Sequence, residues 1–188
     1  MDSPSAQSLP DKIQYGCGQN VFEGWLNVDG FKSYYAWHAV PQAVQEKIHR
    51  MELLDRHPFP DDSFRFGFAE DFLEHLDQAE SLIFLSEAYR CLKPGGVLRL
   101  SFPGLEGVLR RHYRGTHHEG AVTGFKEAYE MWHHKHFYSA ASLETVARHL
   151  GFSDFKQVRF GESNHAELRG LDTRPDQIDL NLMVELTK

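Results

Sequence analysis

Two glycines and an acidic residue near the start of the chain have the types and order of a nucleotide-binding site. Gly16 and Gly18 flank Cys17 directly after a short apolar segment, and Asp29 ends the next one, in GCGQNVFEGWLNVD. In a dinucleotide site, the acid that binds the ribose follows the glycines by about twenty residues, with a full helix between them. Only ten residues separate Gly18 from Asp29, which is too few for a crossover of normal length. The pattern therefore predicts a ligand that uses the glycines and the acid but does not need the helix.

The composition narrows the class of protein. The chain has 188 residues, of which 41% are hydrophobic and 25% are charged, as is typical of one soluble globular domain. A formal net charge of -7 is unlike the broad basic surface of a nucleic-acid-binding protein. No apolar run reaches membrane-spanning length, and the start of the chain lacks the features of a signal peptide. We therefore expect a cytoplasmic protein with neither a nucleic acid nor a membrane as its partner.

The elements that must position these residues alternate along the chain. Strands are expected at residues 12–16, 25–29, 64–69, 97–103, 155–160 and 180–186, and a third short apolar run lies at residues 51–55. Helices are expected over residues 34–50 with an interruption at Pro41, from about Asp71 to Leu92, within residues 104–138, and from the N-cap Ser139 to Gly151. Alternating strands and helices predict an α/β fold with a mostly parallel sheet.

The residues with chemical potential come where strands end. A ligand of a parallel sheet binds beyond the carboxyl ends of the strands, where the topology reverses. Gly16–Gly18, Asp29, Asp55 and Ala69–Asp71 each end or follow an apolar segment. We therefore expect all of them along one edge of the sheet, and this shared position is stronger evidence for a site than any single motif.

Five segments, in order along nearly the whole chain, resemble the class I S-adenosylmethionine-dependent methyltransferases. They are GCG…GWLNVD, LLDRHPFPDDSF, EHL…EAYRCLKPGGVLRLSFPGLE, HKHFYSAASLETVARHLGF and the ending MVELTK. The chain is most similar to the small type 11 branch with a shortened first crossover. The resemblance implies a Rossmann-like, seven-stranded, mostly parallel sheet in the order 3-2-1-4-5-7-6, with strand 7 antiparallel and helices on both faces. It also implies a single methyltransferase domain over residues 1–188, with a helical, lid-like insert at residues 104–138.

The donor that the resemblance implies, S-adenosylmethionine, explains the missing helix. A dinucleotide places its pyrophosphate on a helix N-terminus, whereas S-adenosylmethionine and its product S-adenosylhomocysteine have no phosphate. They need a close approach of the backbone, which glycines permit, and a carboxylate for the ribose hydroxyls. By resemblance, Asp29 is that carboxylate, and Leu54 and Asp55 meet the adenine. The implied cofactor-binding residues are Gly16, Cys17, Gly18, Asp29, Leu54, Asp55, Ala69, Glu70 and His75.

A small molecule is the expected methyl acceptor. The insert at residues 104–138 is rich in aromatic and histidine residues, a composition that suits a pocket from which water is excluded. Glu70 and Asp71 lie on the methyl side by resemblance, although the family often has a histidine where Asp71 stands. We expect His136 to be the general base, because the nearby Ser139 cap fixes its position and an imidazole accepts a proton at neutral pH.

Two alternatives to this interpretation remain open. The short crossover and Asp71 also fit a non-catalytic protein of the same fold that acts as a partner or scaffold subunit. A metal site could be built from His133 and His136, three residues apart, with His117 or His118 as a third ligand. No acid or cysteine completes a recognised spacing, so the sequence predicts no metal, and it makes no prediction about the oligomeric state.

Overall fold

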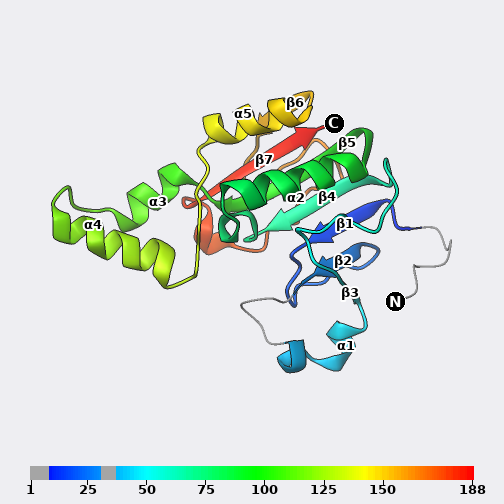
Figure 1. Ribbon diagram of the computed structural model, residues 1–188, viewed down its shortest axis with the longest axis horizontal. Coiled ribbons are helices and arrows are strands. Elements are labelled where there is room, and N and C mark those ends of the chain that lie inside the picture. Colours follow the sequence, from blue (N-terminus) through cyan, green and yellow to red (C-terminus); the bar gives the residue numbers. More distant parts are fainter. Residues whose placement is uncertain (1–8, 31–36) are drawn as a thin grey trace.

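A sheet of seven strands organises the part of the chain that the computed structural model describes, residues 9–30 and 37–188. The strands are β1 (Lys12–Tyr15), β2 (Leu26–Asp29), β3 (Ile48–Arg50), β4 (Phe64–Glu70), β5 (Leu92–Pro103), β6 (Asp154–Gln157) and β7 (Asn181–Thr187). They follow the order β3-β2-β1-β4-β5-β7-β6 (Figure 1). β7 runs antiparallel to both of its neighbours, whereas the other neighbouring pairs are parallel. The predicted fold class and strand order are confirmed.

The connection from β1 to β2 contains no helix in residues 16–25. The buried side chain of Asn27 holds this connection. Its carbonyl oxygen accepts a hydrogen bond from the backbone N–H of Phe22 at 2.9 Å, and its amide nitrogen donates to the Phe22 carbonyl at 3.1 Å. The Phe22 ring packs against Phe68 of β4 with 5.5 Å between ring centroids. Two partly buried hydrogen bonds and an aromatic contact therefore fix the loop that stands where a crossover helix is usual.

The region between β2 and β4 differs from the prediction. A helix is predicted over residues 34–50, of which residues 34–36 lie outside the described part of the chain. The structure has only the short turns η1 (Trp37–Ala39) and α1 (Gln42–Gln45), with Pro41 between them. The predicted helix is wrong at its end, because Ile48–Arg50 pair with β2 as strand β3. The apolar run at residues 51–55 follows this strand as a loop.

Two capped helices pack together on one face of the sheet. α2 (Gln78–Cys91) begins after a capping box in which the Asp77 side chain accepts from the Glu80 backbone and the Glu80 side chain accepts from the Asp77 backbone. The predicted start near Asp71 is therefore too early, and a separate turn, η2 (Leu73–His75), precedes the helix. α5 (Ala140–Leu150) begins after Ser139 and ends at Gly151, as predicted. Their apolar residues join the main core with β1, β4, β5 and β7.

The opposite face of the sheet has a different cover. Phe66 and Phe68 of β4 and Val97 of β5 are buried against Leu168 and Leu171, which belong to the long connection from β6 to β7. Within the described residues, no helix contributes to this cluster. A loop therefore covers the centre of the face on which the resemblance implies helices.

A buried arginine ties this loop to the sheet. Arg99 of β5 is fully buried and forms ion pairs with Asp172 in the loop and with Glu185 of β7. Its guanidinium also donates to the backbone carbonyl of Glu162 at 2.8 Å. Because a buried charge is costly unless it is paired and hydrogen-bonded, this arrangement fixes the position of the loop that precedes η4 (Pro175–Gln177).

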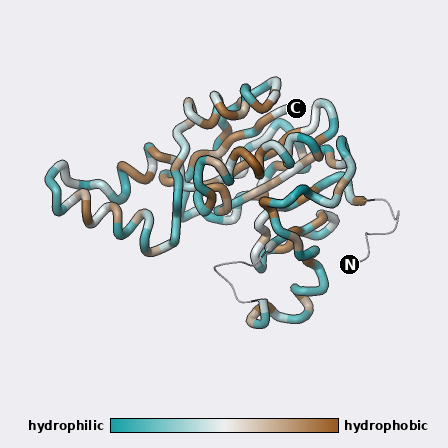
Figure 2. Tube along the Cα trace, in the orientation of Figure 1, coloured by the Kyte–Doolittle hydropathy of each residue, from teal (hydrophilic) through white to brown (hydrophobic). Residues whose placement is uncertain are grey.

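The segment between β5 and α5 forms an extension that projects beyond the carboxyl ends of the strands (Figure 1). It contains α3 (Leu105–His112), α4 (His118–Phe125) and a π-helical turn, η3 (Lys126–Glu130). A small core of its own attaches it to the body, through Val108, Ala128, Phe137 and Leu180. Its colouring alternates between hydrophobic and hydrophilic, whereas the strands and α2 show longer hydrophobic stretches (Figure 2). No described helix has both the length and the apolar character needed to cross a membrane.

Candidate active site

A cavity of about 900 Å³ lies at the carboxyl ends of the central strands. One side of its wall is made by the strand ends, and the other by α3, by η3 and by residues 131–135 and 137, which lead back from the extension. Of the residues expected at this edge, Gly16, Gly18, Asp29, Leu54, Asp71 and His75 line the cavity, whereas Cys17, Asp55, Ala69, Glu70 and His136 do not.

The loop after β1 lies close to the start of η2. Gly16 has a φ of 61°, and a Cβ at this position would lie 2.8 Å from the Cδ2 atom of Phe72. Any larger residue would therefore be strained and would clash with the ring. The backbone N–H of Gly18 donates to the Oδ2 atom of Asp29 at 2.8 Å. This bond orients the carboxylate at the end of β2 toward the glycine loop.

Four of the expected cofactor-binding residues lie outside the cavity, and three of them, Cys17, Ala69 and Asp55, do so for different reasons. The Cys17 side chain is buried, and burial raises the pKa of its thiol to about 12, so the thiol is neutral. Ala69 is buried in the main core, and Asp55 is exposed. Glu52 lines the cavity in this region, and its Oε1 atom accepts from the Leu54 backbone at 3.1 Å. Sequence reasoning missed Glu52 because it precedes the apolar pair that drew attention to Asp55.

The two carboxylates after β4 are engaged with the β6–β7 connection. Glu70 accepts hydrogen bonds from the backbone N–H and the hydroxyl group of Thr173. Asp71 has a positive φ of 49° and pairs with Arg174, whose Nε atom lies 3.0 Å from Oδ2. Burial raises the pKa of both carboxyl groups, while the Thr173 bonds and the Arg174 charge oppose the increase. Asp71 faces the cavity and Glu70 supports the wall behind it.

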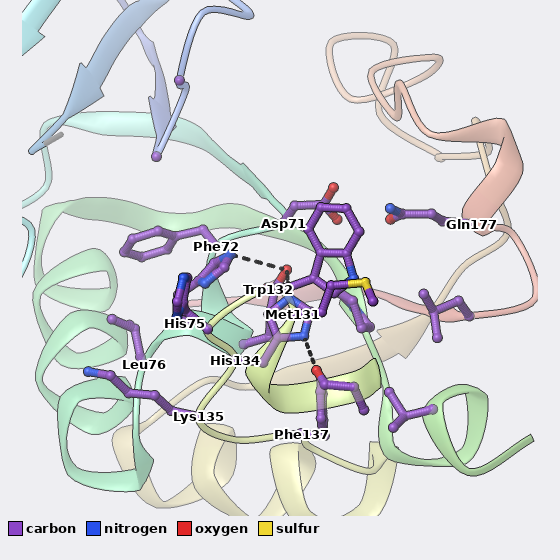
Figure 3. Close-up of a pocket in the computed structure, with 18 of the residues that line it drawn as sticks. Asp71, Phe72, His75, Leu76, Met131, Trp132, His134, Lys135, Phe137 and Gln177 are labelled. Carbon is purple, nitrogen blue, oxygen red and sulfur yellow. Dashed lines mark hydrogen bonds and ion pairs between the residues drawn. The ribbon is translucent and has the colours of Figure 1, made fainter. Parts of the chain in front are cut away.

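A group of three side chains lies deeper on the wall, and the sequence pattern identified only one of them. Glu74 is 1% exposed, and its Oε1 atom lies 3.9 Å from Nε2 of His75 and 4.0 Å from Nε2 of His134. The two imidazole rings lie side by side in the cavity (Figure 3), with 4.9 Å between their centroids. Burial raises the pKa of Glu74 well above its usual range, and it lowers the pKa of His75. Burial also lowers the pKa of His134 to about 4, so this imidazole is neutral at pH 7.

His136, the expected general base, lies near this group but not on the cavity wall. Its ring meets Tyr138 edge-on with 4.5 Å between centroids, and its backbone N–H donates to the Glu74 carbonyl at 3.3 Å. Burial lowers the pKa of His136. The histidines that do line the cavity are His75, His112, His133 and His134.

The titratable residues on the cavity wall are mainly acidic. The lining contains three basic residues, Arg111, Lys135 and Arg174, and seven acidic residues, Asp29, Glu52, Asp71, Glu74, Glu80, Glu127 and Asp176. Two of the three cations are paired with these acids, Arg174 with Asp71 at 3.0 Å and Lys135 with Glu80 at 2.7 Å. Met131 and Trp132 supply apolar surface on the side of the extension. The arrangement favours a ligand with polar groups that are neutral or positively charged.

Comparison with known families and structures agrees with this architecture. Residues 13–100 match a family of methyltransferase domains, and no curated protein matches the chain with significance. A structure of an S-adenosylmethionine-dependent methyltransferase from Thermotoga maritima, a possible histamine N-methyltransferase, is 20% identical with a TM-score of 0.63. The match covers 94% of this chain and 81% of that one.

Two further structures have the same fold. An S-adenosylmethionine-dependent methyltransferase from Mesorhizobium loti is 16% identical, with a TM-score of 0.61 over 96% of this chain and 92% of that one. Phosphoethanolamine N-methyltransferase 2 from Haemonchus contortus, in complex with phosphomonomethylethanolamine and S-adenosylhomocysteine, is 16% identical with a TM-score of 0.58. That match covers 98% of this chain and 50% of the larger protein. At these identities the likeness establishes the fold.

Proposed function

We propose that this chain, whose residues 13–100 form a class I S-adenosylmethionine-dependent methyltransferase domain of the type 11 kind, transfers the methyl group to a small-molecule acceptor. The observation that carries the proposal is the cavity of about 900 Å³ that extends from the strand ends to the α3–α4 extension. Sites for small molecules have volumes of about 300–1,000 Å³. One cavity of this size accommodates the reacting parts of donor and acceptor together.

The strand-end side of the cavity fits the donor. The Gly16 backbone can approach a ligand closely because no side chain stands between them. The Asp29 carboxylate, which Gly18 orients at 2.8 Å, would accept hydrogen bonds from the ribose hydroxyls. Leu54 offers an apolar contact for the adenine. The loop after β1 leads into no helix, so it lacks the N-terminus on which a dinucleotide would place its pyrophosphate.

The wall of the cavity favours an amine as the acceptor. Seven acidic residues against three basic ones attract a cationic group more than a phosphate or a nucleic acid. The names of two structural neighbours include histamine and phosphoethanolamine, which both carry a small amine. Met131 and Trp132 would cover the apolar part of such an acceptor. We therefore assign the acceptor to the small amines.

The chain contributes mainly position and exclusion of water to this reaction. When bound, S-adenosylmethionine would supply a methyl group on a positively charged sulfur atom; the acceptor lone pair would bond to the methyl carbon as the carbon–sulfur bond breaks, with S-adenosylhomocysteine as the leaving group. Asp29 and the glycine loop would hold the donor, and residues of the α3–α4 extension would cover the acceptor as a lid. The general-base role of His136 stays a prediction, because its side chain does not line the cavity.

A methyl-transfer assay with isotope-labelled S-adenosylmethionine tests this function. The assay offers the purified protein a panel of small primary and secondary amines, small alcohols and phenols, and transfer RNA. We expect the label to enter one or more amines, and S-adenosylhomocysteine to accumulate in equal amount. Transfer to RNA alone, or S-adenosylhomocysteine binding without transfer to any small molecule of the panel, would contradict the proposed acceptor class.

A further inference from the structure

Glu74, His75 and His134 bring one carboxylate and two imidazoles together on the cavity wall. One ligand atom from each of these residues lies within 4.8 Å of the other two. Glu74 and His75 belong to η2, directly after the end of β4. His134 comes from the chain that returns from the α3–α4 extension, where Lys135 donates its backbone N–H to the Glu74 carbonyl at 2.8 Å. A backbone contact therefore holds the two contributing segments in register.

A hydrogen bond to the backbone sets which nitrogen of His134 faces the carboxylate. The Nδ1 atom of His134 lies 2.8 Å from the carbonyl oxygen of Ala128. Because a carbonyl only accepts, Nδ1 carries the hydrogen, and Nε2 of the neutral ring has a lone pair directed toward Glu74. The His75 side chain hydrogen-bonds to the backbone of His133, while its Nε2 atom also faces Glu74 at 3.9 Å. Backbone carbonyls that orient the second nitrogen are typical of metal-binding histidines.

Glu74 is a buried carboxylate without a cation in hydrogen-bond contact among the described residues. Its Oε2 atom is buried and has no hydrogen-bond partner there, and the two imidazole nitrogens lie beyond hydrogen-bond distance from Oε1. The nearby cations are engaged elsewhere, since Lys135 pairs with Glu80 and Arg174 with Asp71. Buried charges in proteins are normally paired or coordinate a metal. Glu74 therefore offers an oxygen atom that no described residue of the chain engages.

We propose that Glu74, His75 and His134 bind one divalent transition-metal ion of the zinc type, with an open coordination position directed into the cavity. Two imidazole nitrogens and one carboxylate oxygen suit Zn²⁺ or Fe²⁺, whereas Mg²⁺ and Ca²⁺ prefer oxygen ligands alone. This set with one position left open is that of catalytic rather than structural zinc sites. The sequence pattern suggested His133 and His136 for a metal instead, and neither belongs to this group of three.

The distances are compatible with closure around an ion. Ligands bound to one zinc ion at about 2.0–2.2 Å in tetrahedral geometry lie about 3.3–3.6 Å from one another. The separations of 3.9 and 4.0 Å between Glu74 and the two imidazoles exceed this range by about 0.3–0.7 Å, and the ligand atoms of the two histidines lie within 4.8 Å of each other. Small side-chain rotations would bring the three atoms to bonding distance of one ion. All three residues line the cavity, so an ion bound here would face the methyl acceptor in the cavity.

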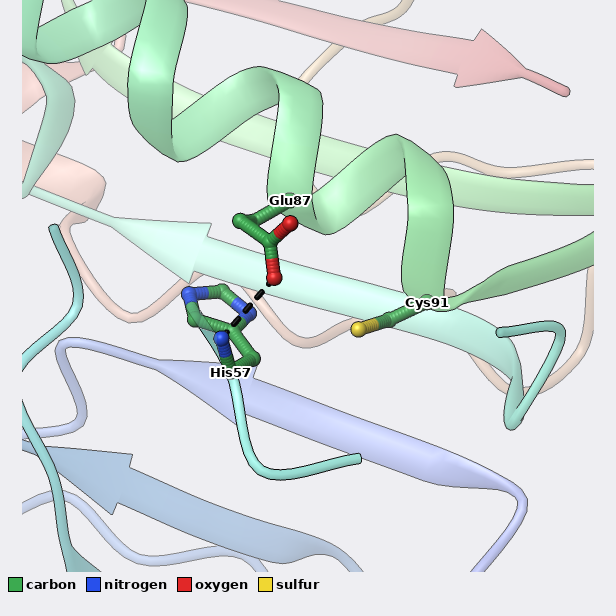
Figure 4. Close-up of side chains that lie close together, drawn as sticks. All are labelled: His57, Glu87 and Cys91. Carbon is green, nitrogen blue, oxygen red and sulfur yellow. Dashed lines mark hydrogen bonds between the residues drawn. The ribbon is translucent and has the colours of Figure 1, made fainter. Parts of the chain in front are cut away.

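A second group of potential ligands provides a contrast. His57, Glu87 and Cys91 also lie close together (Figure 4). Here Arg90 already pairs with Glu87 at 2.7 Å, the His57 backbone donates to Glu87 at 2.8 Å, and burial raises the pKa of Cys91 to about 11. The positive charge that a metal would bring is supplied by Arg90. The carboxylate of Glu87 therefore has its partners without an ion, whereas the Oε2 atom of Glu74 has no hydrogen-bond partner among the described residues.

The ion would anchor the acceptor. This part of the inference rests on the proposed function, because the open position faces the cavity in which donor and acceptor meet. A nitrogen or oxygen atom of the acceptor, other than the atom to be methylated, would complete the coordination. The acceptor would then be held by two points, one on the metal and one on the acidic wall.

Calorimetric titration with Zn²⁺ at neutral pH, after treatment with a chelator and dialysis, tests the site without any acceptor. We expect one equivalent to bind with a dissociation constant in the micromolar range or below, and Glu74→Gln and His134→Gln to weaken binding at least about tenfold. The matched controls are Glu127→Gln and His112→Gln, an acid and a histidine of the same cavity outside the group. Both should bind Zn²⁺ within about threefold of the unchanged protein.

A second readout separates a folding defect from a lost ligand. Co²⁺ in a site with two nitrogen ligands and one oxygen ligand gives visible absorption, which should develop in the unchanged protein and in both controls but not in Glu74→Gln. Thermal unfolding of each variant without metal shows whether it is folded. Absence of Zn²⁺ binding in the unchanged protein, or binding that Glu74→Gln and His134→Gln leave intact in folded protein, overturns the proposal. S-adenosylhomocysteine titration of the same samples tests the proposed function independently, since Asp29 and the glycine loop lie outside the metal group.

Discussion

The two sides of the cavity are built in opposite ways. On the strand-end side, the loop from β1 to β2 is fixed by buried groups: Asn27 bonds to both polar atoms of the Phe22 backbone, and Gly18 bonds to Asp29. On the other side, the α3–α4 extension is attached through a small core. It exposes large apolar side chains, among them Leu109, Phe125 and Met131, of which Met131 is 61% exposed.

Under the proposed function, this difference separates two tasks, the binding of the donor and the entry of the acceptor. The donor is the same molecule in every turnover, so a rigid edge that is preorganised for it costs little reorganisation on binding. A lid must open for the acceptor to enter, and it has to come from the less stable part of a fold. We therefore expect substitutions in the sheet and the loops fixed to it, called here the rigid half, to change stability or donor affinity. Donor binding should instead change the order of the α3–α4 extension.

The largest effect should come from Arg99, which anchors the loop that covers the second face of the sheet. Arg99→Met leaves Asp172 and Glu185 buried without their cation, and breaking a buried ion pair costs about 3–5 kcal/mol. We expect a fall of this size in the free energy of unfolding, measured by urea denaturation. Arg159→Met is the control, because this side chain is exposed on the same loop. Equal stability of Arg99→Met and the unchanged protein would show that the rigid half does not depend on this anchor.

A smaller effect, confined to the donor, is expected from Asp29→Ala. The loss of charge-assisted hydrogen bonds to the ribose, on the order of 2–4 kcal/mol, should weaken S-adenosylhomocysteine binding at least about tenfold. The fold should survive, because Asp29 lies at the end of β2 on the cavity wall. Asp55→Ala is a sharp control, since the exposed Asp55 lies outside the cavity. If Asp55→Ala weakened binding and Asp29→Ala did not, the ribose ligand would have been assigned to the wrong carboxylate.

The smallest expected effect is a change in order of the extension. Saturating S-adenosylhomocysteine should raise the hydrogen-exchange protection of backbone amides in residues 104–138 by at least about tenfold, because a lid opens locally at low cost without ligand. Amides of α5, which contributes no residue to the cavity wall, should change less. Equal protection of the extension in the free and bound protein would remove the distinction between a rigid and a mobile side.

Local signals in the sequence predicted most elements of the fold. Ser139 and Gly151 marked both ends of α5, and apolar segments marked β1, β2, β4, β5 and β7. The confirmed strand order came from the family resemblance. The third strand was misplaced, because Ile48–Arg50 is a strand only through its pairing with β2, and such pairing leaves no mark in three residues. The capping box of Asp77 and Glu80 was readable in the sequence and would have placed the start of α2 correctly.

Site residues could be predicted from the sequence where their place at the end of a strand brings them to the cavity. They could not be predicted where the direction of a side chain in a turn does so. Gly16, Gly18 and Asp29 line the cavity because they follow adjacent parallel strands. Glu74 and His134 became neighbours through a turn after β4 and through a backbone bond between two distant segments. The periodicity of apolar residues along the sequence does not predict a contact between two such distant segments. The only available signal was the acid next to His75 in LEHL, which stands beside a histidine where a strand has just ended.

Calorimetric titration with S-adenosylhomocysteine and with NAD tests the central claim, that the strand-end side is built for a donor without a phosphate. The account predicts a dissociation constant in roughly the micromolar range for S-adenosylhomocysteine and no measurable heat with NAD. The reason is that the edge offers the Asp29 carboxylate and the glycine loop but no helix N-terminus after β1 for a pyrophosphate. Binding of NAD without binding of S-adenosylhomocysteine would contradict the account.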